Sequence, residues 1–346
     1  MKIRKAVVTA AGLGTRLLPA TKAQPKEMLP LVDKPIIQYV VEEAVASGIE
    51  QIIIVTGRGK RAIEDHFDIA FELEYFLSQK GNNGALTEMR QISDLADICY
   101  IRQKAPLGQG HAILVTKYLV GNEPFAVFFA DDVIDNAIPC MKQMMAVYER
   151  YKCSVVAVQE VPREAIARYG VVAAQPIDDR IYRVTGFVEK PRPEEAPSNI
   201  SSLPLYCFSP RILDYLPEVP RSPRGEYELQ DAIQMLIERD GRVGGVTCKR
   251  RLTLTNAADL LAINRHYLMR TDRPQIAPQT VGLNTQLVTP LRIESGTVIG
   301  ANSVIGPNVY IERDCRIGDG VTICNAVVLR ETVVPDGATV VDQVVS

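Results

Sequence analysis

The sequence predicts an α/β fold with a mostly parallel sheet, followed by a short parallel β-helix at the C-terminus. Strand-length apolar runs alternate with helical stretches in the N-terminal part, which is typical of a parallel sheet covered on both faces. After residue 280, aliphatic residues recur at every sixth position, the period of hexapeptide β-helices. Residues 281–346 also contain no Lys, His or Phe, so the composition changes where the repeat begins.

The N-terminal elements follow from the hydrophobic pattern. Residues 5–11 form an apolar run of strand length. Pro35 opens a helix whose apolar residues share one face, and Gly48 closes it. The run at 51–56 (QIIIVT) is β-branched and uninterrupted, and the run at 125–130 (FAVFFA) is apolar, which predicts strands buried on both faces.

The C-terminal repeat predicts a β-helix that we expect to be left-handed. One aliphatic residue points inward on each face of each coil, and small or β-branched side chains two positions earlier fit the corners. Adjacent apolar pairs such as Val298-Ile299 argue against the alternative of ordinary alternating strands. The expected inward positions are Val281, Leu287, Ile293, Ile299, Ile305, Ile311, Ile317, Ile323 and Leu329. Pro335 interrupts this series, so roughly three coils and then a cap are expected.

The change of composition also sets the predicted domain limits. A chain of 346 residues has room for two domains, at about 150 residues each. We therefore expect an N-terminal domain at 1–272, a linker at 273–280 (RPQIAPQT) and the β-helix at 281–346.

Composition and charge exclude several classes of function. The 39 Lys and Arg against 41 Asp and Glu leave a net charge of −2, so no basic field is available to hold nucleic acid. No apolar run approaches the ~20 residues of a membrane helix, so no membrane partner is expected. The seven cysteines stand singly and are odd in number, which predicts reduced thiols in a cytoplasmic protein, without disulfides or a zinc site.

A glycine-containing loop follows the first predicted strand. Gly12 and Gly14 let the backbone approach a phosphate closely, and successive N–H groups can form a nest for an anion. A dinucleotide fingerprint would need a third glycine where Leu17 stands, and the P-loop pattern is also incomplete. The basic side chains of Arg16 and Lys26 follow, which leaves a nucleotide-phosphate loop or, alternatively, a solvated basic surface.

Longer strings extend this pattern along the chain. They are AAGLGTRLLPATKAQPKEMLPLVDKPIIQYVVEEAVASGI from residue 10, VTGRGKRAIEDHFD (55–68), RQKAPLGQGHA (102–112), FAVFFADDVI (125–134), YGVV (169–172), FVEKPRPEEAPSN (187–199) and GEYELQDAI (225–233). Through them the chain resembles bacterial UTP–glucose-1-phosphate uridylyltransferases, of the sugar-1-phosphate nucleotidyltransferase superfamily, over residues 1–235 and more weakly to 270. The resemblance implies a Rossmann-like nucleotidyltransferase domain with Mg²⁺ as cofactor, and UTP and glucose 1-phosphate as substrates.

The resemblance also implies roles for the matching residues. The nucleotide would be bound by Ala11, Gly12, Gly14, Thr15, Glu27, Gln103, Gly108 and Asp132. Arg16 and Lys26 would bind the reacting phosphates and are the candidate catalytic residues. Asp131 lies at the carboxyl end of a strand, where open α/β sheets place ligands, and would hold Mg²⁺. Gly170, Glu189 and Lys190 would form the sugar-phosphate site, with a carboxylate for hydroxyls and an ammonium for the phosphate.

Taken alone, some of these residues have a simpler interpretation. Glu189 and Lys190 would be a surface charge pair, and Asp131 would be a turn residue at a strand end. The surrounding motifs favour the functional roles.

Two departures from the family pattern concern the metal and the sugar. Residues 252–264 read LTLTNAADLLAIN, where these uridylyltransferases usually carry a second metal-binding Asp. Asn256 matches the Asn of the two-domain N-acetylglucosamine-1-phosphate uridylyltransferases; it is either an Mg²⁺ ligand through its amide oxygen or the cap of the following helix. Near Pro204 the family usually has a Gly close to the sugar, so the identity of the sugar stays open.

The implied reaction is an in-line attack of the sugar phosphate on the α-phosphorus of the nucleotide, with pyrophosphate leaving. The attacking oxygen is already anionic, so the protein must hold two polyanions together and neutralise charge in the transition state. The alternatives are a thymidylyltransferase, a uridylyltransferase for another hexose 1-phosphate, and a non-catalytic nucleotide-sugar-binding protein. An acyltransferase site on the β-helix is a further alternative, but such sites generally need a His base and residues 281–346 contain none. The β-helix is expected to join subunits into a homo-oligomer, because a short coil exposes an open end and flat faces.

Overall fold

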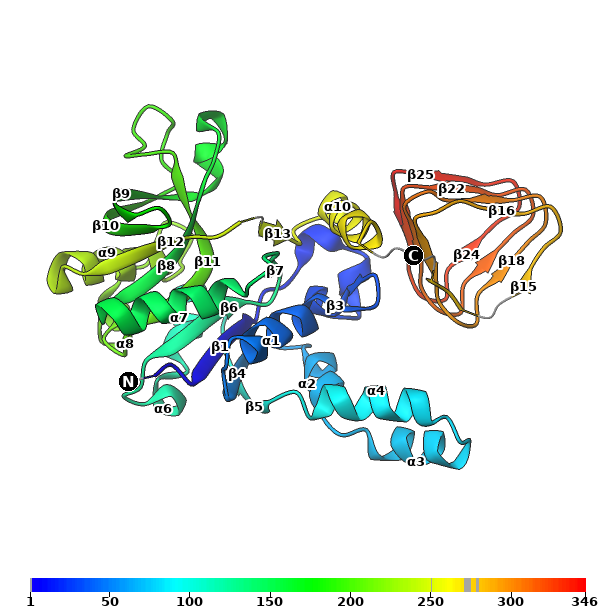
Figure 1. Cartoon of the computed structure of the whole chain (residues 1–346), viewed down its shortest axis with the longest axis horizontal. Helices are drawn as coiled ribbons and strands as arrows, with labels where there is room; N and C mark the ends of the chain where they lie inside the picture. Colours follow the sequence, from blue (N-terminus) through cyan, green and yellow to red (C-terminus); the bar gives the residue numbers. More distant parts are fainter. Residues whose placement is uncertain (1, 250, 271–274, 278–279) are drawn as a thin grey trace. The chain divides into compact units, whose positions relative to one another are not determined.

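The computed structural model describes residues 2–249, 251–270, 275–277 and 280–346, and the chain divides into two compact units (Figure 1). The first unit comprises Met1–Leu13 and Ile36–Arg251, and the second comprises Gly14–Pro35 and Leu252–Ser346. This division differs from the predicted boundary at residue 272. The domain limits taken from the sequence therefore stay a prediction.

Within the described residues, the first unit is built on a nine-stranded mixed sheet in the order β5-β4-β1-β6-β11-β8-β12-β10-β9. Its strands are β1 (Lys5–Ala10), β4 (Gln51–Thr56), β5 (Asp97–Arg102), β6 (Phe125–Phe129), β8 (Ser154–Glu160), β9 (Gly170–Asp178), β10 (Ile181–Glu189), β11 (Ile200–Phe208) and β12 (Val243–Thr247). Strands β5, β4, β1 and β6 are parallel, as predicted for this part of the chain. Strand β11 is antiparallel to both β6 and β8, so the sheet becomes mixed beyond β6.

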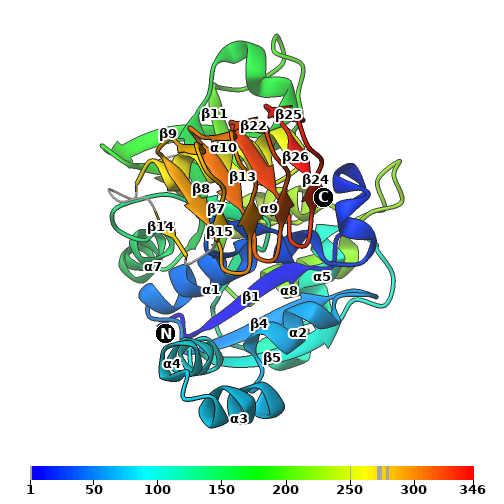
Figure 2. The ribbon, with the colours of Figure 1, turned by 90° about the vertical axis from the view of Figure 1, so that its right-hand side faces the viewer.

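Helices cover both faces of this sheet (Figure 2). The helices of the first unit are α1 (Ile36–Ala46), α2 (Arg61–Phe67), α3 (Phe71–Gln79), α4 (Asn83–Ser93), α5 (Gln109–Leu114), α6 (Lys117–Val120), α7 (Cys140–Tyr151), α8 (Ile212–Tyr215) and α9 (Leu229–Asp240), with 3₁₀ turns at Arg163–Arg168 and Leu216–Glu218. Helices α3 and α4 pack against each other and extend away from the sheet (Figure 1). Helix α7 packs on β8, β11 and β12, whereas α5, α8 and α9 share a core with the β1 residue Val7 and the β6 residue Val127. Strand β6 is fully buried, which explains its uninterrupted apolar sequence. None of the helices in the described ranges has both the length and the apolar character needed to cross a membrane.

The C-terminal part of the second unit is a parallel β-helix, which Figure 1 views nearly along its axis as a triangle. Its described strands form three sheets: β14-β17-β20-β23-β26, β15-β18-β21-β24 and β16-β19-β22-β25. The strands are β14 (Gln275–Ile276), β15 (Thr280–Val281), β16 (Gln286–Leu287), β17 (Leu291–Ile293), β18 (Val298–Ile299), β19 (Val304–Ile305), β20 (Val309–Ile311), β21 (Arg316–Ile317), β22 (Thr322–Cys324), β23 (Ala326–Val328), β24 (Val333–Val334), β25 (Thr339–Val341) and β26 (Val344–Val345). The sixfold repeat thus predicted the right architecture.

The repeat slips by one residue, which corrects both the predicted inward positions and the predicted length. Ile311 pairs with Val328, seventeen positions later, so Leu329 does not hold the inward position expected of it. The inward residues after the slip are Val328, Val334 and Val340, all of them buried. Pro335 consequently falls just after β24 and does not end the coil. In the described residues one face has five strands and the other two have four each, which exceeds the predicted three coils.

The predicted linker at 273–280 contains part of the coil. Gln275–Ile276 form β14, which pairs in parallel with β17. Residues 273, 274, 278 and 279 lie outside the described residues.

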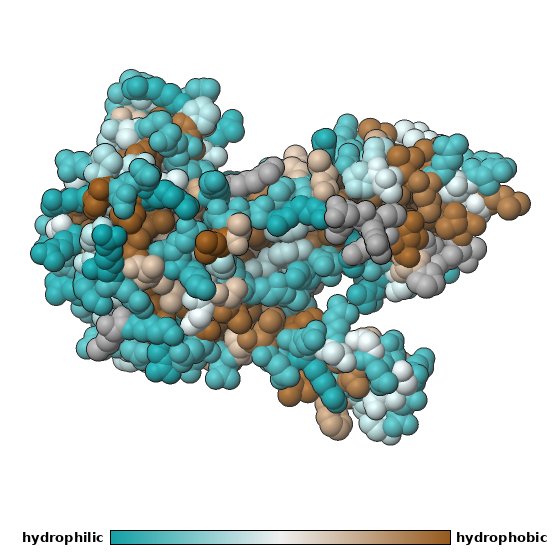
Figure 3. All heavy atoms as spheres, in the orientation of Figure 1, coloured by the Kyte–Doolittle hydropathy of each residue, from teal (hydrophilic) through white to brown (hydrophobic). Residues whose placement is uncertain are grey.

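Aliphatic side chains also lie on the outside of the coil, where Figure 3 shows brown atoms among the hydrophilic ones. The most exposed are Leu283, Val298, Val333 and Val341. The interior is aliphatic in any β-helix, so this outer apolar surface is the feature that needs an explanation.

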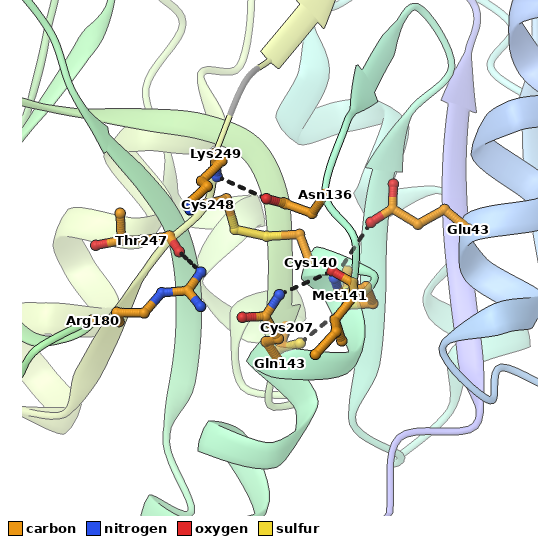
Figure 4. The surroundings of a disulfide bond; sticks show 11 residues. Glu43, Asn136, Cys140, Met141, Gln143, Arg180, Cys207, Thr247, Cys248 and Lys249 are labelled. Atoms are coloured by element: carbon orange, nitrogen blue, oxygen red, sulfur yellow. Dashed lines mark hydrogen bonds between the residues drawn. A yellow bond between two sulfur atoms is a disulfide. The ribbon is translucent and has the colours of Figure 1, made fainter. Parts of the chain in front are cut away.

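The structure contradicts the prediction that all thiols are free, because Cys140 and Cys248 form a disulfide (Figure 4). Cys140 begins α7 and Cys248 follows β12, and both are buried. Their Cα atoms are 6.0 Å apart although 108 positions separate them in sequence. Cysteine spacing could not reveal this pair, since the contact depends on how α7 packs against β12. The cysteine argument for a cytoplasmic location is weakened accordingly.

A buried carboxyl group lies at the same helix end. The backbone N–H of Met141 donates to Oε1 of Glu43 at 3.4 Å, so Glu43 satisfies a helix N-terminal donor from α1 (Figure 4). Burial raises the pKa of Glu43 to about 7, and the N–H groups of Met141 and Cys140 partly oppose this rise. Helices α1 and α7 are therefore joined by a polar contact inside an otherwise apolar region.

Replacing Cys140 by Ser should lower the free energy of unfolding by about 2–5 kcal/mol, the usual cost of removing a native disulfide. The measurement is urea unfolding of the purified, unreduced protein. Cys153→Ser is the matched control, because Cys153 is a free cysteine close to the same α7–β12 region. Denatured, unreduced wild-type protein should show five reactive thiols, since five cysteines of the described chain are free. Seven thiols and equal stability of the two variants would contradict the disulfide.

Candidate functional site

The end of β1 leads into the first part of the predicted nucleotide loop. Ala11 and Gly12 follow directly after β1, and the Gly12 backbone is exposed. A Cβ atom at Gly57, after the neighbouring β4, would lie 3.0 Å from the carbonyl oxygen of Ala11. The two strand-end loops therefore approach each other so closely that a side chain at Gly57 would make a tight contact. The sequence analysis gave no role to Gly57.

Two predicted nucleoside-binding residues, Gln103 and Gly108, are joined by a hydrogen bond. Gln103 is buried after β5, and its Nε2 donates to the carbonyl oxygen of Gly108 at 3.0 Å. Gly108 has φ 91°, and a Cβ there would lie 2.8 Å from Cβ of Glu226, so the turn requires glycine. The predicted pair is thus brought together at the carboxyl end of β5.

His111 lies beside Gln103 in the first unit and was not among the predicted site residues. Its Nδ1 lies 3.0 Å from Nε2 of Gln103. Burial, followed by the nearby charge of Arg221, lowers the pKa of His111, so the ring is neutral at pH 7. Since the amide N–H can only donate, Nδ1 accepts and the other ring nitrogen carries the proton. The ring stacks on Tyr227 with centroids 6.1 Å apart, which fixes its orientation.

Asp131 and Asp132 follow β6 and have different surroundings. Asp132 begins β7 (Asp132–Ile134), and its side chain is only 6% exposed. Arg251 forms a bidentate salt bridge with this carboxylate: Nε donates to Oδ1 at 2.5 Å and Nη2 donates to Oδ2 at 3.1 Å. Asp131 is less buried. Asp132 is predicted from its motif to bind the nucleotide; in the structure it is bound by Arg251, which was not among the predicted site residues.

The residues at this strand end fit Mg²⁺. Mg²⁺ takes oxygen ligands and usually binds through one or two carboxylates while keeping waters and substrate phosphates. Two adjacent aspartates supply such oxygens, and the two hydrogen bonds of Arg251 go to Asp132. Among the described residues no three His, Cys, Asp or Glu side chains come together as a metal cluster.

The three predicted sugar-phosphate residues lie together on the β9–β10 hairpin. Gly170 and Glu189 are cross-strand partners, and a Cβ at Gly170 would lie 2.9 Å from Oε2 of Glu189. Oε2 of Glu189 is buried and has no hydrogen-bond partner in the described structure. Nζ of Lys190 lies 3.2 Å from Oε1 of the same carboxylate. A buried acceptor without a partner is costly, so this atom suits a hydroxyl donor of a ligand.

Tyr206 connects the sugar-phosphate residues with the strand-end aspartates. It is fully buried on β11, and burial raises its pKa to about 12, while a hydrogen bond with Ser202 opposes the rise. The charges of Glu189, Arg251 and Asp132 also affect its pKa, so all three groups are near enough to interact with it electrostatically. Pro204, flagged in the sequence, lies where the β11–β8 register shifts, between Ser202 and Tyr206. Because proline has no N–H to donate, the ladder is interrupted there.

The remaining predicted residues belong to the second unit. Gly14 has φ 67° and precedes a 3₁₀ turn at Thr15–Leu17, and Oγ1 of Thr21 donates to its carbonyl oxygen at 2.8 Å. A Cβ on Gly14 would lie 3.2 Å from Cβ of Lys26, so glycine allows these two residues to pack closely. Thr15 and Arg16 are exposed. Glu27 is 1% exposed, within the 3₁₀ turn Lys26–Met28, so a nucleotide could reach its side chain only after this turn rearranged.

Asn256 acts as a helix cap. Its Oδ1 accepts the backbone N–H of Asp259 at 3.1 Å, and the Asp259 carboxylate accepts the N–H of Asn256, which forms a capping box on α10 (Ala257–Leu268). The prediction that Asn256 caps the following helix is therefore confirmed. Its role as a metal ligand stays a prediction.

Helix α10 also anchors the segment that follows Lys26, through a residue that the sequence analysis missed. Asn264 is 1% exposed on α10. Its Oδ1 accepts the N–H of Val32 at 2.9 Å, and its Nδ2 donates to the carbonyl oxygen of Leu260 at 2.9 Å. A single amide thus satisfies the strained Val32, whose φ is 64°. The only sequence signal was an Asn inside a helical pattern.

Known proteins resemble both parts of the chain. The nucleotidyl transferase family matches residues 5–262, and the GMPPB C-terminal domain family matches residues 287–346. The UTP–glucose-1-phosphate uridylyltransferase YngB of Bacillus subtilis (strain 168) is 52% identical over 239 residues, which are 69% of this chain and 80% of that protein. A UTP–glucose-1-phosphate uridylyltransferase of Staphylococcus haemolyticus (strain JCSC1435) is 51% identical over 235 residues, 68% of this chain and 82% of that protein.

Solved structures give the same result. A UDP-glucose pyrophosphorylase complexed with UDP-glucose aligns with a TM-score of 0.70 at 39% identity, over 78% of this chain and 100% of that chain. A UTP-bound UGPase from Acinetobacter baumannii aligns with a TM-score of 0.73 at 37% identity, over 78% of this chain and 95% of that chain.

Proposed function

This chain belongs to the nucleotidyl transferase family, and from that premise we propose that it is a UTP–glucose-1-phosphate uridylyltransferase. It transfers the uridylyl group of UTP to glucose 1-phosphate and releases pyrophosphate. The observation that carries this proposal is the sugar-phosphate cluster of Gly170, Glu189 and Lys190, in which one oxygen of the Glu189 carboxylate pairs with the Lys190 ammonium and the other is a buried acceptor without a partner in the described structure. Relatives about half identical carry the same name. The neighbouring structures with UDP-glucose and with UTP support both substrates.

The mechanism follows from the charges of the reacting groups. A phosphate oxygen of glucose 1-phosphate forms a bond with the α-phosphorus of UTP, and the bond from that phosphorus to the bridging oxygen of pyrophosphate breaks. The nucleophile is already ionised, so no side chain has to remove a proton. Arg16 and Lys26 bind the reacting phosphates and Lys190 binds the sugar phosphate, which brings two polyanions together and stabilises the charge that develops.

The remaining residues position the substrates. Gln103 and Gly108 bind the nucleoside, where the amide of Gln103 can both donate to and accept from a pyrimidine edge. Ala11, Gly12, Gly14 and Thr15 offer backbone N–H groups to the phosphates. Asp131 would hold Mg²⁺, and the amide oxygen of Asn256 is a further candidate ligand; the ion would supply positive charge against the phosphates.

A substrate panel tests this function. UTP, dTTP, ATP and GTP are each combined with several hexose 1-phosphates in the presence of Mg²⁺, and pyrophosphate release is measured. UTP with glucose 1-phosphate should give the highest kcat/KM. A preference for dTTP or for another sugar would identify one of the related transferases. No release from any pair would contradict an enzymatic function and favour a nucleotide-sugar-binding protein.

The β-helix accounts for a second property, which we propose is homo-oligomer formation. All the residues assigned to substrates or metal precede α10, so the coil is not required for the chemical step. Its exposed aliphatic residues Leu283, Val298 and Val333 suit contact with a second copy of the chain.

A further inference from the structure

We infer that Arg251 is a positioning residue for the proposed reaction: it holds Asp132 away from the metal so that Mg²⁺ binds productively at Asp131. This inference rests on the proposed uridylyl transfer. Nothing in the sequence motifs pointed to Arg251. It is identified by its contacts with the strand end that carries both aspartates.

The geometry of the ion pair is the first argument. Arg251 makes two hydrogen bonds to Asp132, at 2.5 and 3.1 Å, which use both carboxylate oxygens. The arginine side chain is 20% exposed and that of Asp132 is 6% exposed. A bidentate salt bridge that is mostly buried fixes the orientation of the carboxylate. A single hydrogen bond from lysine would not do so.

The segment that carries Arg251 is itself held in place at two further points. Cys248 forms the disulfide with Cys140, and the N–H of Lys249 donates to Oδ1 of Asn136 at 3.2 Å (Figure 4). Both partners lie on the stretch that begins with Asp132 and continues into α7. The segment that carries Arg251 is therefore anchored to the same stretch of chain that carries Asp132.

Charge is the second argument. Asp132 and Asp131 both act on Arg251, and so does Tyr169, the neighbour of Gly170. Arg251 is thus a partly buried cation close enough to interact with both aspartates. Without it, two adjacent carboxylates would share one divalent ion, because Mg²⁺ prefers carboxylate oxygens. Asp132 would then compete with Asp131 for the ion, so we expect divalent ions to bind more tightly and catalysis to be slower.

The variants Arg251→Met and Arg251→Lys separate positioning from charge. Each is assayed for kcat and KM with UTP and glucose 1-phosphate, and substrate-free protein is titrated with Mn²⁺ by electron paramagnetic resonance. Arg251→Met should lower kcat about 100-fold, as expected for loss of preorganisation, with KM values changed less than about threefold. It should also tighten Mn²⁺ binding at least about fivefold, since a nearby positive charge is lost. Arg251→Lys should keep Mn²⁺ affinity close to wild type while kcat stays low, because lysine lacks the second arm.

The matched control is Arg239→Met. Arg239 forms a bidentate salt bridge with Glu218 as well, with hydrogen bonds of 2.9 and 2.8 Å, but both side chains are about half exposed. Its kcat and Mn²⁺ affinity should equal those of the wild type. Weaker Mn²⁺ binding in Arg251→Met, unchanged kcat in that variant, or full rescue of kcat by lysine would each overturn the inference. Inactive wild-type protein would instead refute the proposed function, while the Mn²⁺ titration would still test the arginine.

Discussion

Replacing Asp131 by Asn should reduce kcat by about 10²–10³-fold while the protein stays folded, the size of effect seen when one transition-state contact is removed. A neutral amide holds Mg²⁺ more weakly than a carboxylate does, and the substitution preserves shape. Asp131 lies at the end of a fully buried parallel strand, so the substitution should not disturb the backbone. The measurement is UDP-glucose formation over a range of Mg²⁺ concentrations.

The control for this experiment is Asp179→Asn. Asp179 is an exposed aspartate in the turn between β9 and β10, away from the strand end. Its variant should retain full activity, and both variants should unfold at the wild-type temperature. If the Asp131 variant turned over within about threefold of wild type, the metal would have to bind elsewhere, and Asn256 would become the next residue to replace.

The second large effect is expected in the β-helix, where Ile305→Asp should unfold the coil. Ile305 is fully buried on β19, between β16 and β22. A carboxylate placed there would lose its water without gaining a partner, at a cost of several kcal/mol. The coil should then become sensitive to protease, and the protein should sediment as a smaller species. Catalysis should survive in part, because the substrate residues precede the coil.

Thr322→Asp is the control on the neighbouring strand. Thr322 points outward on β22 and is exposed, so the same carboxylate remains in water. This variant should keep a protease-resistant coil. If Ile305→Asp unfolded the coil without changing the assembly state, the coil would not be the oligomerisation element.

The sequence allowed correct prediction of those parts of the fold that depend on local pattern. Strand β4 matches the predicted range 51–56, and β1 and β6 each end one residue earlier than predicted. The β-helix followed from a period of six. Its slip was hidden because the neighbouring apolar residues Val328 and Leu329 both fit the pattern, and only the pairing with Ile311 distinguishes them.

Prediction of the site depended on motifs, and it missed residues whose role comes from distant contacts. Gly170, Glu189 and Lys190 lie in recognisable strings and meet on one hairpin. Arg251 and the Cys140–Cys248 pair have no such strings, since their partners lie more than a hundred positions away. Spacing along the chain carries no information about contacts of that kind. The burial of Glu27 was also beyond local sequence, because it depends on the packing of several turns.

One isotope experiment tests the proposed reaction most directly. Glucose 1-phosphate labelled with ¹⁸O at its three non-bridging phosphate oxygens is incubated with UTP, Mg²⁺ and the full-length protein, and the products are analysed by mass spectrometry. In-line attack by the sugar phosphate on the α-phosphorus predicts UDP-glucose that retains all three labels and pyrophosphate that contains none. Label in the pyrophosphate, or the absence of labelled UDP-glucose, would contradict the proposed function.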